Sequence, residues 1–240
     1  MNLTQFILRK ILPTLLPSPA QTRHFQYSML YSADDEKGQA SNRLISIALE
    51  AVKKAQDVSL KDVSTRLIGM PDYPEVWPGE HYKLLAGLIL TLKPKTVIEI
   101  GTYTGISALA MKKFLQPGAK LYTYDIFQWS TFKDTCLNKE DFSDGQLVQL
   151  IDDLTDPVTL TKHKSLLENA DLIFVDAAKD GSQEQKFLDN FETLSFKNKP
   201  ILVFDDIRVW NMLKIWREIS RPKLDLTSFG HWAGTGLVEW

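Results

Sequence analysis

The sequence of 240 residues has the composition of an ordinary soluble protein: 44% of its residues are apolar, 24% are charged, and the net charge is −2. This balance implies no strongly basic face and argues against nucleic acid as a partner. Cys136 is the only cysteine, which excludes a disulfide framework and a cysteine-rich zinc site. We expect no membrane span and no signal peptide, and therefore a cytoplasmic protein.

Residues 1–78 are predicted to form an N-terminal helical cap on the substrate side of the molecule. Prolines and glycines break this region into short helices, and the clearest spans roughly 40–56, where apolar residues recur at helical spacing. The apolar start, residues 1–19, carries Arg9 and Lys10. It is expected to form a short amphipathic docking helix, with a peripheral membrane anchor as the alternative.

Residues 79–240 form the second predicted domain, in which short apolar strands alternate with helices. This alternation predicts a parallel sheet covered on both faces. The expected strands are 96–100, 120–126, 146–152, 170–176 and 200–206, and the expected helices are 80–91, one ending near 115, 157–168, 181–194 and 208–219. Two further strands, 223–230 and 235–240, are expected to close the sheet as an antiparallel hairpin. The fold class is α/β, a doubly wound, Rossmann-like sheet.

Acidic residues follow these strands repeatedly, and open α/β sheets bind ligands beyond the carboxyl ends of their strands. The acidic residues are Asp125, Asp152, Asp153, Asp176, Asp205 and Asp206. Aspartate also follows strands as an ordinary turn or helix-cap residue. That explanation is weaker for a pattern shared by four strands, so the set indicates a ligand site.

The most specific local signal is VIEIGTYTGIS at residues 97–107. Gly101 and Gly105 bracket a tight turn between a strand and a helix, where glycine allows unusual backbone angles and close approach to a ligand. The spacing differs from the G-x-G-x-x-G of dinucleotide-binding loops, and Glu99 in the strand suits a cationic or polyhydroxyl ligand better than a phosphate. Asp125, at the end of the next strand, is placed to accept hydrogen bonds from a ribose diol. Together these residues fit S-adenosylmethionine.

At these residues the sequence resembles the class I S-adenosylmethionine-dependent methyltransferases, over roughly residues 79–240. FVDAAKDG (174–181) and VFDDI (203–207) narrow the resemblance to the metal-dependent small-molecule O-methyltransferases of the catechol and caffeoyl-CoA type and their macrolide-sugar relatives. The resemblance implies a seven-stranded sheet with an antiparallel last strand. It implies cofactor contacts at Glu99, Gly101, Thr102, Tyr103, Gly105, Ser107, Asp125, Asp153 and Asp176, with Asp153 preferred to Asp152 beside the adenine.

Asp176, Asp205 and Asp206 end two neighbouring strands of the predicted sheet, so their carboxylates can converge. Uncompensated, such a cluster forces at least one carboxyl to hold a proton, and a divalent metal removes the conflict. Oxygen ligands favour Mg²⁺ ahead of Mn²⁺ or Ca²⁺, and the resemblance implies metal ligands at these three positions. The catechol and caffeoyl-CoA types have asparagine where this sequence has Asp206. Without a metal, Asp205 would orient substrate or cofactor and Asp206 would cap the following helix.

Lys179 matches the catalytic base of the catechol type. Beside a metal and a cationic cofactor its pKa would fall below about 10.4, which makes a neutral amine available. The expected reaction is O-methylation of a small hydroxylated acceptor. The metal lowers the pKa of the hydroxyl, Lys179 takes the proton, and the oxyanion attacks the S-methyl group in line. A solvated lysine paired with Asp180 is the plainer alternative.

Two aromatic segments are expected to line an acceptor pocket or to pack in the core. They are DYPEVWPGEHY (72–82) and FGHWAG (229–234). His231 is an alternative catalytic base. Phe127 or Trp129 is expected to stack on the adenine.

Three other functions stay open from the sequence. A metal-free O- or N-methyltransferase would use His231 or desolvation alone. A nicotinamide-dependent oxidoreductase is disfavoured by the missing third loop glycine, and a non-catalytic cofactor-binding module is disfavoured by the intact set of acids. The oligomeric state is open between a monomer and a homodimer.

Overall fold

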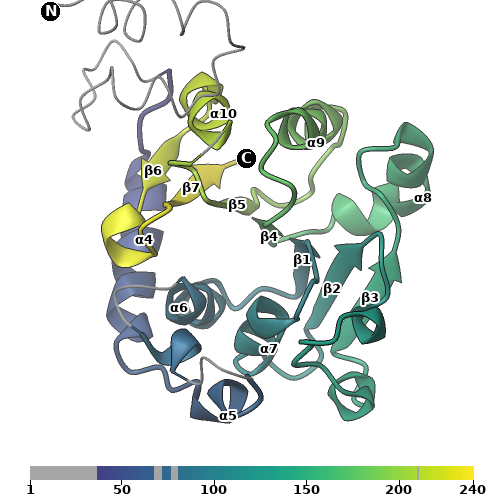
Figure 1. Cartoon of the computed structure of the whole chain (residues 1–240). Coiled ribbons are helices and arrows are strands. Elements are labelled where there is room, and N and C mark those ends of the chain that lie inside the picture. The colour runs from purple at the N-terminus through teal and green to yellow at the C-terminus, as the bar shows by residue number, and fades with distance from the viewer. Residues whose placement is uncertain (1–36, 68–71, 77–80, 210) are drawn as a thin grey trace, which may run out of the picture.

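The computed structural model describes residues 37–67, 72–76, 81–209 and 211–240. Its centre is a seven-stranded sheet with the order β3-β2-β1-β4-β5-β7-β6 (Figure 1). The strands are β1 (Thr96–Ile100), β2 (Lys120–Asp125), β3 (Leu147–Ile151), β4 (Leu172–Val175), β5 (Ile201–Asp205), β6 (Lys223–Asp225) and β7 (Thr235–Glu239). Strands β1 to β5 pair in parallel, and β7 runs antiparallel to β5 and β6. The predicted α/β fold with its antiparallel last strand is confirmed.

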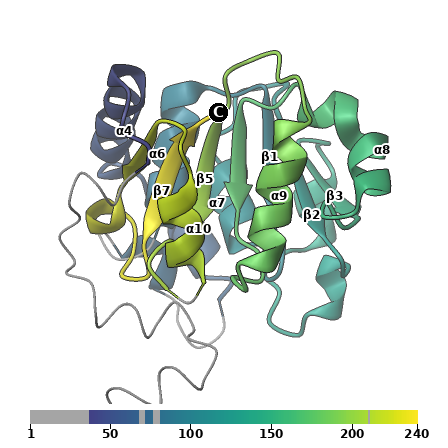
Figure 2. The ribbon, with the colours of Figure 1, turned by 90° about the horizontal axis from the view of Figure 1, so that it is seen from above.

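Helices cover both faces of the sheet (Figures 1 and 2). One face carries α4 (Asn42–Ala55), α5 (Lys61–Ser64), α6 (Tyr82–Leu92) and α7 (Ile106–Lys112), and the other carries α8 (Pro157–Leu167), α9 (Ser182–Glu192) and α10 (Met212–Glu218). Successive strand residues point to opposite faces. Val97 and Val203 therefore pack in the first layer, whereas Ile98 and Leu202 pack in the second.

Local sequence explains where several elements begin. Helix α4 starts after Ser41, whose side chain accepts a hydrogen bond from the N–H of Leu44. Helix α8 starts at Pro157 after Asp156, which caps the helix through its carboxylate. All four residues of β4 are buried, as expected for an apolar strand covered on both faces.

The described part of the predicted N-terminal cap is continuous with the α/β core. Helix α4 packs along α6 and buries Leu44, Ala48 and Ala51 on its predicted apolar face. A Cβ atom at Gly87 of α6 would lie 2.3 Å from the Ala51 carbonyl oxygen, so glycine permits this close contact. The predicted docking helix at 1–19 lies outside the described residues.

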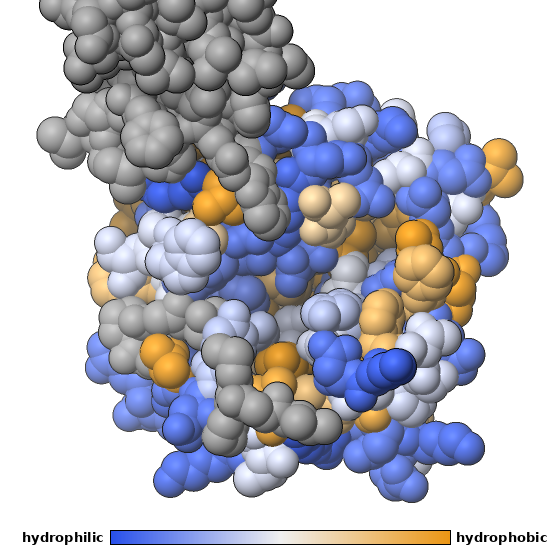
Figure 3. All heavy atoms as spheres, in the orientation of Figure 1, coloured by the Kyte–Doolittle hydropathy of each residue, from blue (hydrophilic) through white to orange (hydrophobic). Residues whose placement is uncertain are grey.

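The described part of the chain holds no helix that could cross a membrane. None of its helices combines the length and the apolar character that such a crossing needs. The face seen in Figure 3 is mostly hydrophilic, with hydrophobic residues in separate patches.

Candidate active site

A pocket of about 300 Å³ opens beyond the carboxyl ends of β1, β2, β3 and β4. It lies where β1 is flanked by β2 on one side and β4 on the other, the switch point at which open α/β sheets bind ligands. Of the predicted cofactor residues, the pocket is lined by Gly101, Tyr103, Asp125, Asp153 and Asp176. The structure thus brings together residues from the ends of four strands.

The two loop glycines are required by the backbone. Gly101 has a φ of 104°, and a Cβ atom there would lie 1.9 Å from the carbonyl oxygen of Asp176. Gly105, just before α7, has a φ of 81°, and its Cβ would lie 2.3 Å from the Leu137 side chain. Only glycine combines such angles with such contacts at low cost. The close neighbour in both cases is the chain itself, so these glycines set the path of the loop backbone, and Gly101 lines the pocket.

Asp125 holds the glycine loop in place. Its Oδ2 accepts hydrogen bonds from the N–H groups of Thr102 at 3.1 Å and Tyr103 at 3.0 Å, and its Oδ1 accepts one from Phe127 at 2.9 Å. A carboxylate offers about four acceptor positions, so one remains for a ligand. Asp125 therefore supports the loop and can still bind a ribose hydroxyl.

Glu99 lies beneath the loop and is not among the residues that line the pocket. It accepts a hydrogen bond from the Ser107 hydroxyl at 2.5 Å. Burial raises the pKa of Glu99 to about 8, so at neutral pH the side chain is largely protonated. The charge that the sequence suggests for a cationic ligand is therefore suppressed by burial, and the cofactor contacts of Glu99 and Ser107 stay predictions.

The two aspartates after β3 both line the pocket but differ in their partners. Asp152 pairs with Lys162 and His163, each at 2.8 Å, and these partners lower its pKa. Asp153 accepts a hydrogen bond from the N–H of Thr155 at 2.8 Å. Asp153 thus has no charged partner comparable to those of Asp152, and its place beside the adenine stays a prediction.

Aromatic side chains stand at the mouth of the pocket. Tyr103 and Phe127 line it and are 56% and 57% exposed, and Phe132 makes edge contacts with both rings. Trp129 instead stacks on Phe142, with ring centroids 5.6 Å apart, and does not line the pocket. Of the two residues predicted to stack on adenine, Phe127 lines the pocket and Trp129 does not, and the stacking itself stays a prediction.

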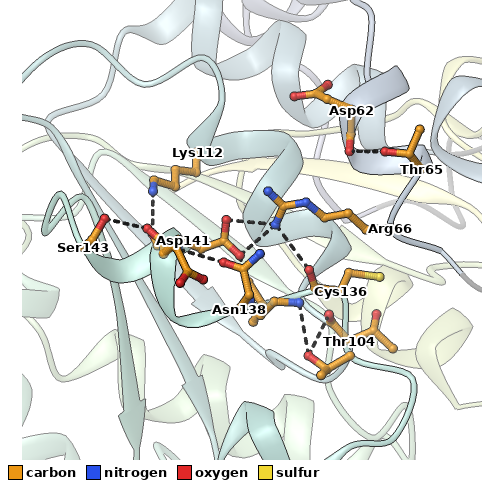
Figure 4. Close-up of polar contacts among 12 residues, drawn as sticks. Asp62, Thr65, Arg66, Thr104, Lys112, Cys136, Asn138, Asp141 and Ser143 are labelled. Carbon is orange, nitrogen blue, oxygen red and sulfur yellow. Dashed lines mark hydrogen bonds and ion pairs between the residues drawn. The ribbon is translucent and has the colours of Figure 1, made fainter.

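An ion pair outside the pocket supports the glycine loop (Figure 4). The Nη1 of Arg66 donates to Asp141 Oδ2 at 2.8 Å and to the carbonyl oxygen of Cys136 at 3.3 Å. The N–H of Cys136 donates in turn to the carbonyl oxygen of Thr104 at 2.8 Å. Arg66, which precedes the sheet in the sequence, thereby helps to hold the backbone of the glycine loop at Thr104.

The second group of predicted residues gathers beyond β4 and β5 and is called the carboxylate cluster below: Asp176, Asp205 and Asp206. The Nζ of Lys179 lies 2.5 Å from Asp176 Oδ1, 2.7 Å from Asp205 Oδ2 and 3.1 Å from Asp206 Oδ2. Lys179 and Asp205 are buried, whereas 34% of the Asp176 side chain is exposed. The three aspartates converge on one point, and the ammonium group of Lys179 occupies it.

The charges of the cluster shift its pKa values. Although burial works against it, the three carboxylates raise the pKa of Lys179 above its ordinary value. This direction is opposite to the one expected beside a metal and a cationic cofactor, because the neighbours of Lys179 in the structure are anions. Burial and the charge of Asp205 raise the pKa of Asp176 to about 6.

Asp205 also contacts two histidines. Its Oδ1 lies 2.5 Å from Nε2 of His231 and 3.3 Å from Nδ1 of His81. Although burial works against it, the two imidazoles and Lys179 hold the pKa of Asp205 well below its ordinary value. One atom from each of His81, Asp205 and His231 lies within 4.8 Å of the others, so among the described residues this trio is spaced closely enough to hold a metal ion. The three oxygens of the carboxylate cluster are spaced more widely than this.

His81 is the member of the site that the sequence does not reveal. The sequence predicts it only as a residue of an aromatic segment, and the structure packs it against Phe174 and His231. Trp77 of the same segment lies outside the described residues, and Trp232 of the second segment is 80% exposed. No local pattern marks His81, because its partner Asp205 is distant in the chain.

The turn that carries Lys179 is held by α9. Lys179 has a φ of 61°, and Asp206 opposite it has a φ of 57°. The buried Glu184 accepts hydrogen bonds from the N–H groups of Lys179 at 2.7 Å and Gly181 at 2.9 Å. Asp180 accepts bonds from backbone N–H groups of α9, so the Lys179–Asp180 pair considered from the sequence is not what the structure shows.

Comparisons with known proteins bear on this geometry. A family model described as O-methyltransferase matches residues 69–215. No curated protein matches the chain. The structure resembles that of the Podospora anserina methyltransferase PaMTH1 bound to SAH, with a TM-score of 0.51, 19% identity, and coverage of 89% of this chain and 99% of that chain. The comparison with the O-methyltransferase TomG of Streptomyces achromogenes gives a TM-score of 0.48 and 15% identity, and it covers 79% of this chain and 89% of that chain. Because the identity is only 19%, the similarity to PaMTH1 supports the fold and nothing more specific.

Proposed function

This chain belongs to the O-methyltransferase family, and on that premise we propose that it transfers a methyl group from S-adenosylmethionine to a hydroxyl oxygen of a small molecule. One observation carries the proposal: Asp176 lines the pocket and also belongs to the carboxylate cluster. A methyl donor in the pocket and a hydroxyl at the cluster would meet at the end of β4. In-line transfer needs this adjacency, because the reacting atoms must come within about 3–3.5 Å.

The pocket supplies the cofactor contacts in this proposal. Asp125 accepts a hydrogen bond from one ribose hydroxyl with its remaining acceptor position. Asp153 lies beside the adenine and Phe127 stacks on it, since both line the pocket. The loop from Gly101 to Tyr103 closes over the methionine part.

Lys179 is the residue assigned to the acceptor's proton. Its Nζ lies 2.5 Å from Asp176 Oδ1, at the border between pocket and cluster. Once away from the carboxylates, Lys179 can lose its proton to solvent, and the neutral amine can then accept the hydroxyl proton. The oxyanion attacks the methyl carbon as the bond from that carbon to sulfur breaks, which leaves S-adenosylhomocysteine. His231 orients Asp205 through their 2.5 Å contact and is the alternative base.

Mg²⁺ is part of the proposal, held by Asp176, Asp205 and Asp206. The chemistry of the donor set fits, because oxygen-only sets suit hard cations and one oxygen of each carboxylate lies within 3.1 Å of Nζ of Lys179. The three oxygens would draw closer together around the ion, since they do not all lie within 4.8 Å of one another. When bound, a divalent cation lowers the pKa of a hydroxyl that it coordinates.

The position of Lys179 also favours a second candidate, a metal-free O- or N-methyltransferase. The ammonium group already offsets part of the carboxylate charge. His231 hydrogen-bonded to Asp205 has the partner that a general base needs. Full activity in the presence of a chelator would favour this candidate.

Two measurements test the proposal. Calorimetry with S-adenosylhomocysteine, and with NAD as the control, should show binding of the first ligand only. Transfer of a labelled methyl group from S-adenosylmethionine to a panel of catechols and other phenols should be lost in EDTA and restored by Mg²⁺. Binding of NAD without binding of S-adenosylhomocysteine would overturn the proposal.

The acceptor is proposed to be a small hydroxylated molecule rather than a nucleic acid, in keeping with the net charge of −2. The cytoplasmic location stays a prediction from the sequence. Light scattering on the purified chain would separate a monomer from a homodimer.

A further inference from the structure

We propose that Lys179 is a built-in cation that occupies the divalent-metal position and must leave it before a metal ion binds. The inference rests on the proposed function for the location of that metal. It goes beyond that function because it makes Lys179 the residue that sets the affinity of the site for metal.

The geometry shows one cation position with three donors. The Nζ of Lys179 is within 3.1 Å of one oxygen from each of Asp176, Asp205 and Asp206. Only 6% of the Lys179 side chain is exposed, so the ammonium is enclosed by the cluster and does not lie over it in solvent. Those same three oxygens are the ones that a metal ion at this point would use.

The turn before α9 directs the lysine onto this point. The backbone N–H of Lys179 donates to Glu184 at 2.7 Å, and the N–H of Gly181 donates to the other oxygen of the same side chain at 2.9 Å. Glu184 is fully buried, so both ends of the turn are anchored to α9. The left-handed backbone of Lys179, with a φ of 61°, is a conformation that costs a non-glycine residue free energy. Such strain persists only where the surroundings enforce it.

Charge favours an exchange of the two cations. The cluster places three carboxylates against one ammonium group, so negative charge remains in excess. A divalent ion would offset one charge more than the lysine does. Mg²⁺ binds oxygens at about 2.0–2.1 Å. A Mg²⁺ ion among the three carboxylates would therefore lie close to the present position of Nζ. The two cations would repel each other strongly there, so the lysine has to leave.

The histidines allow the site to survive the exchange. Asp205 contacts Lys179 through Oδ2, whereas its Oδ1 contacts His231 and His81. When Lys179 leaves, Asp205 therefore keeps two partners and its orientation. Asp176 is partly exposed at the border of the pocket, which gives the released lysine a route toward the acceptor.

Binding of Mn²⁺, measured by electron paramagnetic resonance at fixed pH and ionic strength, tests the exchange on the full chain. Lys179→Met keeps the apolar stem and removes the competing charge, so it should bind Mn²⁺ at least about tenfold more tightly than the wild type. Lys179→Arg keeps the charge and should show no gain. Lys214→Met is the matched control, because Lys214 is exposed and pairs only weakly with Glu218. It loses the same charge and should bind Mn²⁺ as the wild type does.

Equal or weaker Mn²⁺ binding by Lys179→Met than by the wild type would overturn the exchange, and so would a lack of Mn²⁺ binding in every variant. Calorimetry with S-adenosylhomocysteine on the same samples keeps the two proposals apart. If that ligand binds and the Mn²⁺ affinities do not differ, the exchange fails and the methyltransferase proposal stands. A crystal soaked in Mn²⁺ should show anomalous density among the three carboxylates, with Lys179 turned away. Density elsewhere would also refute the exchange.

Discussion

The glycine loop and the carboxylate cluster both place buried or half-buried acids at strand ends, but they satisfy these acids differently. Asp125 accepts three hydrogen bonds from backbone N–H groups of the loop and the segment after it. The carboxylate cluster is compensated by side chains, namely Lys179, His231 and His81. Backbone donors cannot leave unless the loop unfolds, whereas a side chain can rotate away. The first region is therefore scaffold, and the second is built for exchange.

The largest expected effect is on the scaffold. Gly101→Ala forces an alanine to a φ of 104° and places its Cβ 1.9 Å from the Asp176 carbonyl oxygen. We expect a loss of about 3–5 kcal/mol in the free energy of unfolding, measured by urea denaturation. Gly118→Ala is the matched control, because Gly118 has a φ of 82° and a Cβ added there would meet no atom within 4 Å. It should lose only about 1–2 kcal/mol. Equal losses would show that the contact with Asp176 does not matter.

Next in size is the effect of Asp205→Asn on turnover. The change removes the charge that faces Lys179 and both histidines. We expect kcat to fall by about a hundredfold or more, with the affinity for S-adenosylhomocysteine within about threefold of the wild type. Steady-state kinetics and calorimetry on the same preparation measure the two quantities.

Asp125→Asn is the counterpart in the scaffold. Asparagine has one acceptor oxygen instead of two and carries no charge. It cannot accept from the loop N–H groups and from the N–H of Phe127 at once, and it is a weaker acceptor for a ribose hydroxyl. The affinity for S-adenosylhomocysteine should fall by about tenfold or more, and kcat at saturation should fall much less. If both variants changed the same kinetic parameter, the division between scaffold and exchangeable site would be wrong.

The fold was predictable because its signals are local. The strands from β1 to β5 are short apolar runs, and the glycine turn follows the first of them, so the sheet and its switch point could be read along the chain. The resemblance to S-adenosylmethionine-dependent O-methyltransferases is confirmed by the family match. The convergence of Asp176 with Asp205 also follows from sequence, since their strands are neighbours.

The partners of these acids were not predictable, because they depend on side-chain torsions and on contacts between distant residues. Nothing in the sequence near Lys179 says that its side chain points at Asp205 rather than into solvent. His81 reaches Asp205 from the start of α6, and Glu99 is cut off from the pocket by the loop above it. The sequence shows which acidic and basic residues are available at the site. Which of them are buried, and which side chains they pair with, could be seen only in the structure.

A further prediction concerns pH and Glu99, which lies beneath the scaffold. Burial raises the pKa of Glu99 from 4.5 to about 8, so between these values the folded chain holds a proton that the unfolded chain releases. The stabilising effect is therefore complete below pH 4.5 and is lost as the pH rises through 8, by up to about 1.4 kcal/mol per pH unit. Glu99→Gln cannot titrate, so its free energy of unfolding should change less between about pH 5 and 8. Parallel curves for the two proteins in urea titrations would contradict this origin.

The smallest effect should come from the mouth of the pocket. Phe127 lines the pocket and is 57% exposed, so its ring is available to a ligand and contributes little to the core. Phe127→Leu removes a stacking surface worth about 0.5–1.5 kcal/mol, which corresponds to a loss of S-adenosylhomocysteine affinity between about twofold and tenfold. Phe229→Leu is the control, because Phe229 is also exposed but lies outside the pocket. Calorimetry should show weaker binding in the first variant alone, with the stability of both close to that of the wild type. Unchanged affinity in Phe127→Leu would show that the adenine does not stack on this ring. Tyr103, the exposed aromatic residue of the glycine loop, would then be the next residue to test.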